Sequence, residues 1–405
     1  MLIRLAIKSL LDRKSSIILS CIAMTISIFV LLGVEHIRKE SKDSFSSTIS
    51  GADLIVGARS GQLNLLLYSV FRMGSPVNNI SWRSYKDIAG NQNVDWTIPI
   101  SLGDSHKGFR VLGTTNDYFK FFNYGKKQSL SINQGNEFNG IYDVVIGADV
   151  AKRLNYQLGQ SIVLSHGIAD TSFAAHDQHP FIVTGILAPT GTPVDQTVHV
   201  KLEGIEAIHQ ESNTVETSEL QSGKFQPSSI TAFIVGLKSR IATFRLQREI
   251  NEMESEALMA ILPGVALSEL WRMMATFEST LLLISAMVFA AAILGLAAVM
   301  ASSIKERKKE IYLLRTIGAP PGFLFILFQI EALLISVISL VIGSALLTLT
   351  LIIAQKQVST HIGLHLGVNP ITASSAIIAI SILLTTILVA SLPSFQAYKQ
   401  AKSVR

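Results

Sequence analysis

The sequence has little charge and almost no cysteine. Only 16% of its 405 residues are Asp, Glu, Lys or Arg, whereas 49% are hydrophobic and the mean hydropathy is +0.42. Soluble domains carry about 25% charged residues, so this composition excludes an ordinary soluble globular protein. The single cysteine, Cys21, excludes an intrachain disulfide, so a domain outside the cytoplasm must be held together by its own hydrophobic core.

The sequence also lacks the motifs of common catalytic sites. It contains no Gly-x-x-x-x-Gly-Lys-Ser/Thr phosphate-binding loop and no Gly-x-Ser-x-Gly nucleophile motif. The scattered Ser and Asp residues have no spacing that identifies a hydrolase triad. We therefore expect no catalytic residues and no enzyme activity in the chain itself.

Four long apolar segments account for the hydrophobic excess. They cover residues 15–34, 279–304, 321–354 and 372–396, and within them Glu331 is the only acid. A helix of about 20 apolar residues crosses a bilayer core of about 30 Å. One such segment could be a buried helix of a globular core, but four predict a membrane protein with four transmembrane α-helices, arranged as one plus three.

The first apolar segment has one alternative interpretation, a secretory signal peptide, because four basic residues precede it. However, the segment is long, and the charged residues 35–39 follow it without a small-x-small cleavage site. We therefore expect an uncleaved first span, preceded by an amphipathic helix over residues 1–14.

Basic residues beside the spans predict the orientation of the chain. They gather before the first span, between the second and third spans, and after the fourth, whereas the loop 355–371 holds only Lys356. The positive-inside rule then places both termini and residues 305–320 in the cytoplasm, and residues 35–278 outside it. The basic residues on the cytoplasmic side are Arg4, Lys8, Arg13, Lys14, Lys305, Arg307, Lys308, Lys309, Arg315, Lys399, Lys402 and Arg405. The net positive charge thus reflects topology, and we expect no nucleic-acid partner.

The outer segment is long enough for one or two domains with their own cores. Its short apolar runs between Gly and Pro predict strands, and runs with helical spacing predict helices. The pattern indicates a large α/β domain, with a membrane-proximal subdomain over about 43–111 and 229–278 and an inserted β-rich subdomain over about 112–228. Residues 240–261 are predicted to form one helix, and the polar residues 211–229 a loop or lid.

The segment 305–319 combines a charged first half with an apolar edge. Its residues favour a helix that stops at Gly318. Ile311, Leu314 and Ile317 lie along one edge of this helix, which could lie at the membrane surface or press into the groove of a partner. A solvated loop that only sets topology would explain the basic residues, but not this edge.

The whole arrangement resembles the FtsX/MacB-like permeases of ABC transporters. The segment after the second span matches the family's cytoplasmic coupling helix, and Glu331 matches an acid that the family often carries early in the next span. The start LAIKSLLDRKSS, and the outer segments VVIGADVAKRLNYQLGQSIVL and FIVTGILA, also resemble the family. The positions that match the coupling helix are Arg307, Lys309, Glu310, Ile311, Leu314, Arg315, Gly318 and Ala319.

This resemblance implies a multi-pass subunit in the inner membrane of a Gram-negative bacterium, with its large domain in the periplasm. It implies a separate cytoplasmic ABC ATPase that binds ATP and Mg²⁺, because relatives with a fused ATPase carry it before the first span. A second permease copy or a paralogue would complete a dimer within the membrane lipid, and a periplasmic adaptor or binding protein could join. The coupling helix would pass ATP-driven motion to the outer domains, for export or extraction of a substrate.

Alternative functions remain open at the level of sequence. In the cell-division relatives the same plan serves a non-transporting regulator or scaffold of periplasmic proteins. A metal-linked periplasmic transport system is a further alternative, because imidazole groups close in sequence could bind zinc. The candidate ligands are His166, His176, His179 and His199. Histidines that lie in a polar loop and bind no metal are more common than histidines that form a metal site.

The third span raises two further questions. Glu331 could be an ion relay, but we favour a side chain that is hydrogen-bonded within the helix bundle. Residues 321–354 would form a straight helix of about 50 Å, which exceeds the bilayer core. The helix is therefore expected either to break near Gly343-Ser344 or to project beyond the membrane.

Overall fold

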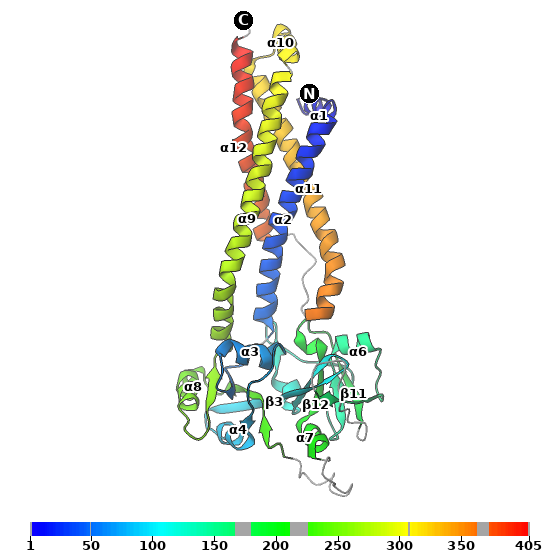
Figure 1. Cartoon of the computed structure of the whole chain (residues 1–405), viewed down its shortest axis with the longest axis vertical. Helices are drawn as coiled ribbons and strands as arrows, with labels where there is room; N and C mark the ends of the chain where they lie inside the picture. Colours follow the sequence, from blue (N-terminus) through cyan, green and yellow to red (C-terminus); the bar gives the residue numbers. More distant parts are fainter. Residues whose placement is uncertain are drawn as a thin grey trace. The chain divides into compact units, whose positions relative to one another are not determined.

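The computed structural model describes residues 2–48, 50–166, 180–210, 226–306, 308–362 and 372–403 (Figure 1). The chain divides into two compact units. A helical unit takes in Met1–Ser41, Met274–Lys356 and the C-terminal helix, and an α/β unit takes in Lys42–Met273.

Among the described residues, four helices are long and apolar enough to cross a membrane. They are α2 (Lys14–Ser47), α9 (Pro263–Glu306), α11 (Pro321–Ile362) and α12 (Ala373–Ser403). The predicted fold class is confirmed, since the strands of a mixed α/β domain lie between the first and second of these helices. Each helix also extends beyond the apolar segment that predicted it, because helical hydrogen bonding continues into the polar flanks.

The helical unit is held together by apolar side chains from all four long helices. Met24, Leu296, Phe328 and Ala390 are buried in one shared core. The outer faces are also apolar, as expected for surfaces that meet lipid rather than water. Exposed side chains on these faces include Leu283, Leu294, Ile353, Ile380 and Leu388.

The third long helix, α11, is one unbroken helix of 42 residues. It does not break at Gly343, so the first of the two expectations for this span, a broken helix, is wrong. Instead, Gly343 lies where α2 approaches closely: a Cβ atom there would lie 3.2 Å from the carbonyl oxygen of Thr25 and 3.2 Å from Cγ2 of Ile28. Small residues at such points allow membrane helices to pack backbone to backbone.

The α/β unit is built on one continuous, mixed sheet of 11 strands within the described residues. Its main order is β15-β1-β14-β3-β4-β12-β8-β11-β7, while β10 pairs with β3 and β9 with β11. The strands are β1 (Leu54–Ala58), β3 (Val94–His106), β4 (Phe109–Thr114), β7 (Ile132–Gly135), β8 (Asp143–Ile146), β9 (Ser161–Ile162), β10 (Ser165–His166), β11 (Phe181–Leu187), β12 (Thr197–Lys201), β14 (Ala232–Leu237) and β15 (Leu258–Ile261).

Strand β3 joins the two halves of this sheet. Its first part pairs with β14, for example Ile98 with Ile234, and its second part pairs with β4, for example Leu102 with Leu112. The expected subdomain boundary near residue 112 therefore falls inside β4, and the two expected subdomains share β3.

Helices cover the faces of the sheet and complete its cores. Helix α4 begins after Ser81, whose hydroxyl accepts the backbone N–H of Ser84 and so caps the first turn. Apolar residues of the strands and these helices form three buried clusters. The remaining elements are α3 (Gln62–Val70), α4 (Trp82–Ala89), α5 (Asp117–Phe121), α6 (Ala148–Leu154), α7 (Leu202–Gln210), α8 (Thr243–Asn251), β2 (Ile80–Ser81), β5 (Asn123–Tyr124), β6 (Gln128–Ser129), β13 (Ser229–Ile230) and the 3-10 turns η1 (Pro193–Gln196) and η3 (Arg240–Ala242).

The prediction of one helix over residues 240–261 is wrong at its C-terminal end. Helix α8 stops at Asn251, and Leu258–Ile261 form the edge strand β15, which pairs antiparallel with β1. The side-chain oxygen of Asn251 accepts the backbone N–H of Ala260 (2.7 Å), which fixes the return of the chain. Pairing with β1 buries Leu258 and Ile261, and this burial outweighs the local helical pattern. Of the expected loop 211–229, residues 211–225 lie outside the described residues.

Candidate functional site

Helix α10 (Lys308–Thr316) connects α9 to α11 and ends in a closed turn. The backbone N–H of Ala319 donates to the carbonyl of Leu314 (2.9 Å), and that of Gly318 donates to the carbonyl of Arg315 (3.0 Å). These bonds form a Schellman motif, which requires a left-handed residue, and Gly318 supplies it with a φ of +96°. The guanidinium of Arg315 also donates to the carbonyl of Ala319 (3.0 Å). The helix is thus joined to α11 by a short turn with few free dihedral angles.

The structure buries part of the apolar edge expected on this helix and leaves the other part exposed. Ile311 is 4% exposed and, with the partly buried Leu314, packs into the core formed by α2, α9, α11 and α12. These two side chains therefore anchor α10 to its own bundle and are not free to enter a partner's groove, which corrects the sequence interpretation. The apolar surface that remains open consists of Tyr312, Leu313 and Ile317, which are 59%, 60% and 81% exposed.

The charged positions of the expected coupling helix are described only in part. Glu310 lies in the first turn of α10 and is exposed. Arg307 lies outside the described residues, and for Lys309 only the backbone is described. The structure thus brings together Glu310, Arg315 and the Gly318-Ala319 turn at one end of the helical unit, with the exposed apolar residues of α10 between them.

Glu331 is buried in α11 and is tied to the N-terminal helix α1 (Leu2–Leu11). The hydroxyl of Ser9 donates to the Glu331 carboxylate at 2.5 Å, and both side chains are less than 9% exposed. An acid within a span is costly unless it finds a partner, so this bond gives Glu331 a structural role in the bundle. It also links α1 to the helix that follows α10.

Helix α1 presents an exposed apolar stripe made of Ile3, Ile7 and Leu11. The basic Arg4 and Lys8 lie beside this stripe and are exposed. A helix with this distribution lies well in the interface between lipid head groups and acyl chains. Residues Leu2–Leu11 thus form an amphipathic helix, which ends before the Lys14 that begins α2.

The proposed metal ligands do not form a described site. His199 is fully buried in β12, where its Nδ1 contacts the carbonyl of Val145 (3.1 Å) and its ring packs against Tyr118. His176 and His179 lie outside the described residues, and for His166 only the backbone is described. In the part of the chain that the structure describes, no group of three His, Cys, Asp or Glu side chains is placed to hold a metal ion.

His199 belongs instead to a buried polar cluster beside Arg72 and Tyr118. Burial and the neighbouring Arg72 guanidinium lower the pKa of His199 to about 3, so its imidazole is neutral at physiological pH. Arg72 donates to the carbonyl of Ser69 at the C-terminus of α3, where the helix dipole favours a cation, and to the hydroxyl of Tyr118 (3.4 Å). All three side chains are buried, so the cluster lies within the core of the α/β unit.

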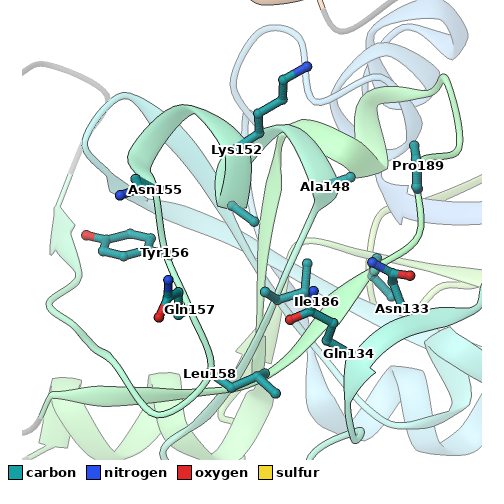
Figure 2. A pocket seen from close by; sticks show the side chains of 12 residues that line it. Asn133, Gln134, Ala148, Lys152, Asn155, Tyr156, Gln157, Leu158, Ile186 and Pro189 are labelled. Carbon is teal, nitrogen blue, oxygen red and sulfur yellow. The ribbon is translucent and has the colours of Figure 1, made fainter.

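A cavity of about 690 Å³ lies in the α/β unit between α6 and the edge of the sheet (Figure 2). Among the described residues, its lining carries four side-chain amides, one lysine and no acid. The amides belong to Asn133, Gln134, Asn155 and Gln157, and the lysine is Lys152. Ala148, Ala151, Tyr156, Leu158, Ile186, Leu187 and Pro189 complete the lining.

One wall of this cavity is held in place by a buried histidine. His106 donates its Nδ1–H to the carbonyl of Val163 (2.7 Å), and its Nε2 accepts the hydroxyl of Tyr156 (2.8 Å). Lys107 donates to the same hydroxyl (3.0 Å). Burial lowers the pKa of His106, which keeps the neutral tautomer that this arrangement needs. The Tyr156 ring therefore has a fixed orientation.

Two of these features were missed by reasoning from the sequence. The open surface of α10 depends on which side of the helix meets α12, and no local pattern reports that contact. The amide-lined cavity combines residues near 134, 152, 157 and 187, which become neighbours only when the sheet forms. The available signals were two clusters of Asn and Gln, at 133–136 and at 155–160.

Comparison with known families gives two matches. A model described as the FtsX-like permease C-terminal matches residues 282–402, which take in α10, α11 and most of α9 and α12. A model described as the MacB-like periplasmic core domain matches residues 17–253, which take in α2 and most of the α/β unit. A search of curated proteins returned no match.

Solved structures with similarity to the chain include two outer domains. The periplasmic region of MacB from Actinobacillus actinomycetemcomitans is 11% identical, with a TM-score of 0.36, and the match covers 55% of this chain and 94% of that one. The extracellular domain of the noncanonic ABC-type transporter YknZ from Gram-positive bacteria is 13% identical, with a TM-score of 0.32, and the match covers 52% and 99%.

Proposed function

Because the chain belongs to the FtsX/MacB-like family of ABC-transporter permeases, we propose that it couples ATP hydrolysis by a separate ATPase to motion of its α/β unit. The family makes the chain a membrane permease component of a transport system and not itself an enzyme. In this proposal α10 faces the cytoplasm of a bacterial inner membrane, and the MacB-like domain faces the periplasm. Two copies, or one copy and a paralogue, bind two ATPase subunits.

The observation that carries this proposal is the form of α10. Tyr312, Leu313 and Ile317 form an exposed apolar surface on a helix that is anchored internally by Ile311. Large apolar side chains exposed together on a rigid helix favour docking in a groove of another protein. The Schellman turn at Gly318 then passes a displacement of α10 directly to α11.

A second observation supports transmission within the membrane. The Ser9–Glu331 bond ties α1 to α11, and Gly343 packs α11 closely against α2. A push on α10 would therefore reach α1, α2 and α11 together. The substrate would be moved or extracted at the α/β unit, and no residue of this chain would take part in ATP chemistry.

The test is a charge substitution on the exposed surface of α10. Ile317→Asp should lower ATPase copurification from native membranes at least about fivefold, because a docked apolar residue contributes about 1–3 kcal/mol to an interface. The matched control is Ile241→Asp, since Ile241 is 92% exposed in the α/β unit. Copurified ATPase is measured by mass spectrometry and by ATP turnover. If both variants retained wild-type turnover, the coupling role of α10 would be wrong.

A further inference from the structure

Strand β7 (Ile132–Gly135) is the last strand at one end of the sheet as far as the described residues show. In the described part of the chain, β7 pairs only with β11. Asn133, Gln134 and Gly135 are exposed. The strand holds neither Lys nor Pro, the residues that commonly protect an edge from added strands. Its free backbone groups are therefore open to pairing with another extended chain.

A β-bulge turns this edge toward the cavity of Figure 2. Gln134 pairs with Ile186 and Ile132 pairs with Leu187, so Asn133 is an extra residue between the two pairs. A bulge of this kind redirects a side chain and bends the strand. As a result, the amides of both Asn133 and Gln134 line the cavity, together with Ile186 and Leu187 of the neighbouring strand (Figure 2).

The opposite wall comes from one face of α6 and the segment that follows it. Ala148, Ala151, Lys152 and Asn155 share this face, because they are three or four residues apart. Asn155 closes the helix in a left-handed conformation with a φ of +54°. The cavity thus has an apolar floor and a polar rim.

The polar rim has hydrogen-bonding capacity that the fold does not use. Among the described residues, the side-chain amides of Asn133, Gln134, Asn155 and Gln157 have no hydrogen-bond partner. An amide both donates and accepts, which matches the alternating N–H and C=O groups of a polypeptide. Lys152 is the one charged residue among the described residues of the lining, and its ammonium points outward from α6, away from the amides (Figure 2), so a ligand that extends from the cavity toward α6 is favoured there if it carries a negative group.

We propose that the edge of β7 and the amide-lined cavity bind an extended peptide segment of a partner protein, which adds to the sheet as a strand and places an acidic side chain near Lys152. An added strand would lie about 4.8 Å beyond β7, and alternate side chains would point to the α6 face. Main-chain hydrogen bonds with β7 would supply affinity, and the cavity would select the side chain. This binding needs neither ATP nor the ATPase, so it stands apart from the proposed function.

The test uses the full chain in lipid nanodiscs and three fluorescein-labelled pentapeptides. The probe Thr-Val-Glu-Val-Thr is compared with versions carrying Gln or Lys at the centre. Fluorescence anisotropy should give the Glu peptide the tightest binding, by about fivefold to tenfold over the Lys peptide. Hydrogen exchange in the presence of the Glu peptide should slow at residues 132–135 and leave β15, the other edge strand, unchanged.

Two charge substitutions separate the cavity from general surface charge. Lys152→Glu should reverse the preference, so that the Lys peptide binds tighter than the Glu peptide. Lys126→Glu changes the same charge on an exposed residue outside the lining and should leave the order of affinities as in the wild type. Equal affinity for all three peptides, or equal effects of the two substitutions, would overturn the proposal. So would protection of residues 132–135 by tetra-N-acetylchitotetraose, a neutral glycan, when no peptide protects them.

Discussion

At the scale of single residues, the backbone of Gly318 sets the junction between α10 and α11. Its φ of +96° is unfavourable for any residue with a Cβ atom, although the space around it is open. A side chain at Gly318 would therefore strain the backbone without a steric clash, so the effect of a substitution reports backbone strain alone.

We predict that Gly318→Ala weakens this junction by about 1–2 kcal/mol. Hydrogen exchange at the amides of residues 318 and 319 should then become at least about fivefold faster. The matched control is Gly322→Ala, because Gly322 also lies in open space but has helical geometry. Alanine should stabilise that position slightly. Equal exchange rates in the two variants would contradict the role assigned to Gly318.

A second residue-scale prediction concerns His199 and acid stability. Its pKa is about 3 in the folded protein and about 6.5 when unfolded, so the unfolded chain binds one more proton between these values. The free energy of unfolding should therefore fall with decreasing pH, by about 2 kcal/mol from this group between pH 6.5 and pH 5. His106, whose pKa is also lowered, adds to the same trend.

The measurement for this prediction is urea unfolding followed by tryptophan fluorescence. The three tryptophans, Trp82, Trp96 and Trp271, all lie in the α/β unit, so their emission reports that unit in the full chain. His199→Phe should lower stability at pH 7 but give a flatter dependence on pH. A slope equal to that of the wild type would show that His199 does not titrate on unfolding.

The residues differ in how far their roles could be predicted. Gly318 could be recognised from sequence because a C-terminal Gly-Ala stop is a local signal. The burial of Ile311 could not, since it depends on helices that are distant in the sequence. The role of His199 could not be predicted for the same reason. It lies near other histidines in sequence, but β12 directs its side chain into a core of aromatic residues.

At the scale of elements, the close approach of α2 and α11 at Gly343 suggests the sharpest test of packing in the helical unit. We predict that Gly343→Leu separates these helices and lowers the melting temperature of the protein in detergent, because its Cβ alone would lie 3.2 Å from the α2 backbone. Gly295→Leu in α9 is the control, because nothing lies within 4 Å of its Cβ position. Similar melting temperatures for the two variants would refute close packing at Gly343.

The elements show where hydrophobic patterns are sufficient and where they fail. The four spans are predicted well, since their length and lack of charge are local properties. The helix predicted over residues 240–261 wrongly includes the strand β15, because Leu258–Ile261 are apolar and follow a helical pattern without a break of Gly or Pro. A strand is more favourable than a helix there only because β1 has an edge with which these residues can pair.

At the scale of the whole molecule, the orientation in the membrane can be tested with the single native cysteine removed. In a Cys21→Ser background, Lys126→Cys should react with a membrane-impermeant maleimide in intact spheroplasts. Ile317→Cys should react only after the membrane is permeabilised. Both positions are exposed, so access to the reagent depends on the side of the membrane. Labelling of Ile317→Cys in intact spheroplasts would contradict the cytoplasmic placement of α10.

The plan of the molecule was the most predictable feature, and the details of the sheet were the least. One span, an outer α/β segment and three further spans follow from hydropathy alone. The sheet, however, joins its strands in the order β1-β14-β3-β4. In two of these pairs, β1 with β14 and β14 with β3, the two strands are distant in sequence. Nothing local in the sequence encodes those pairings, so the single sheet through β3 appeared as two subdomains.

The position of β1 in the sheet has a consequence for folding during synthesis. This strand lies directly after the first span, yet its two neighbours in the sheet are β14 (Ala232–Leu237) and β15 (Leu258–Ile261). During synthesis the apolar residues of β1 leave the membrane early and stay unpaired until almost the whole outer segment has been translocated. They are covered only when the ribosome is about to deliver the second span. An arrest of translocation before residue 232 would therefore leave both edges of this apolar strand unpaired, a state that is prone to aggregation.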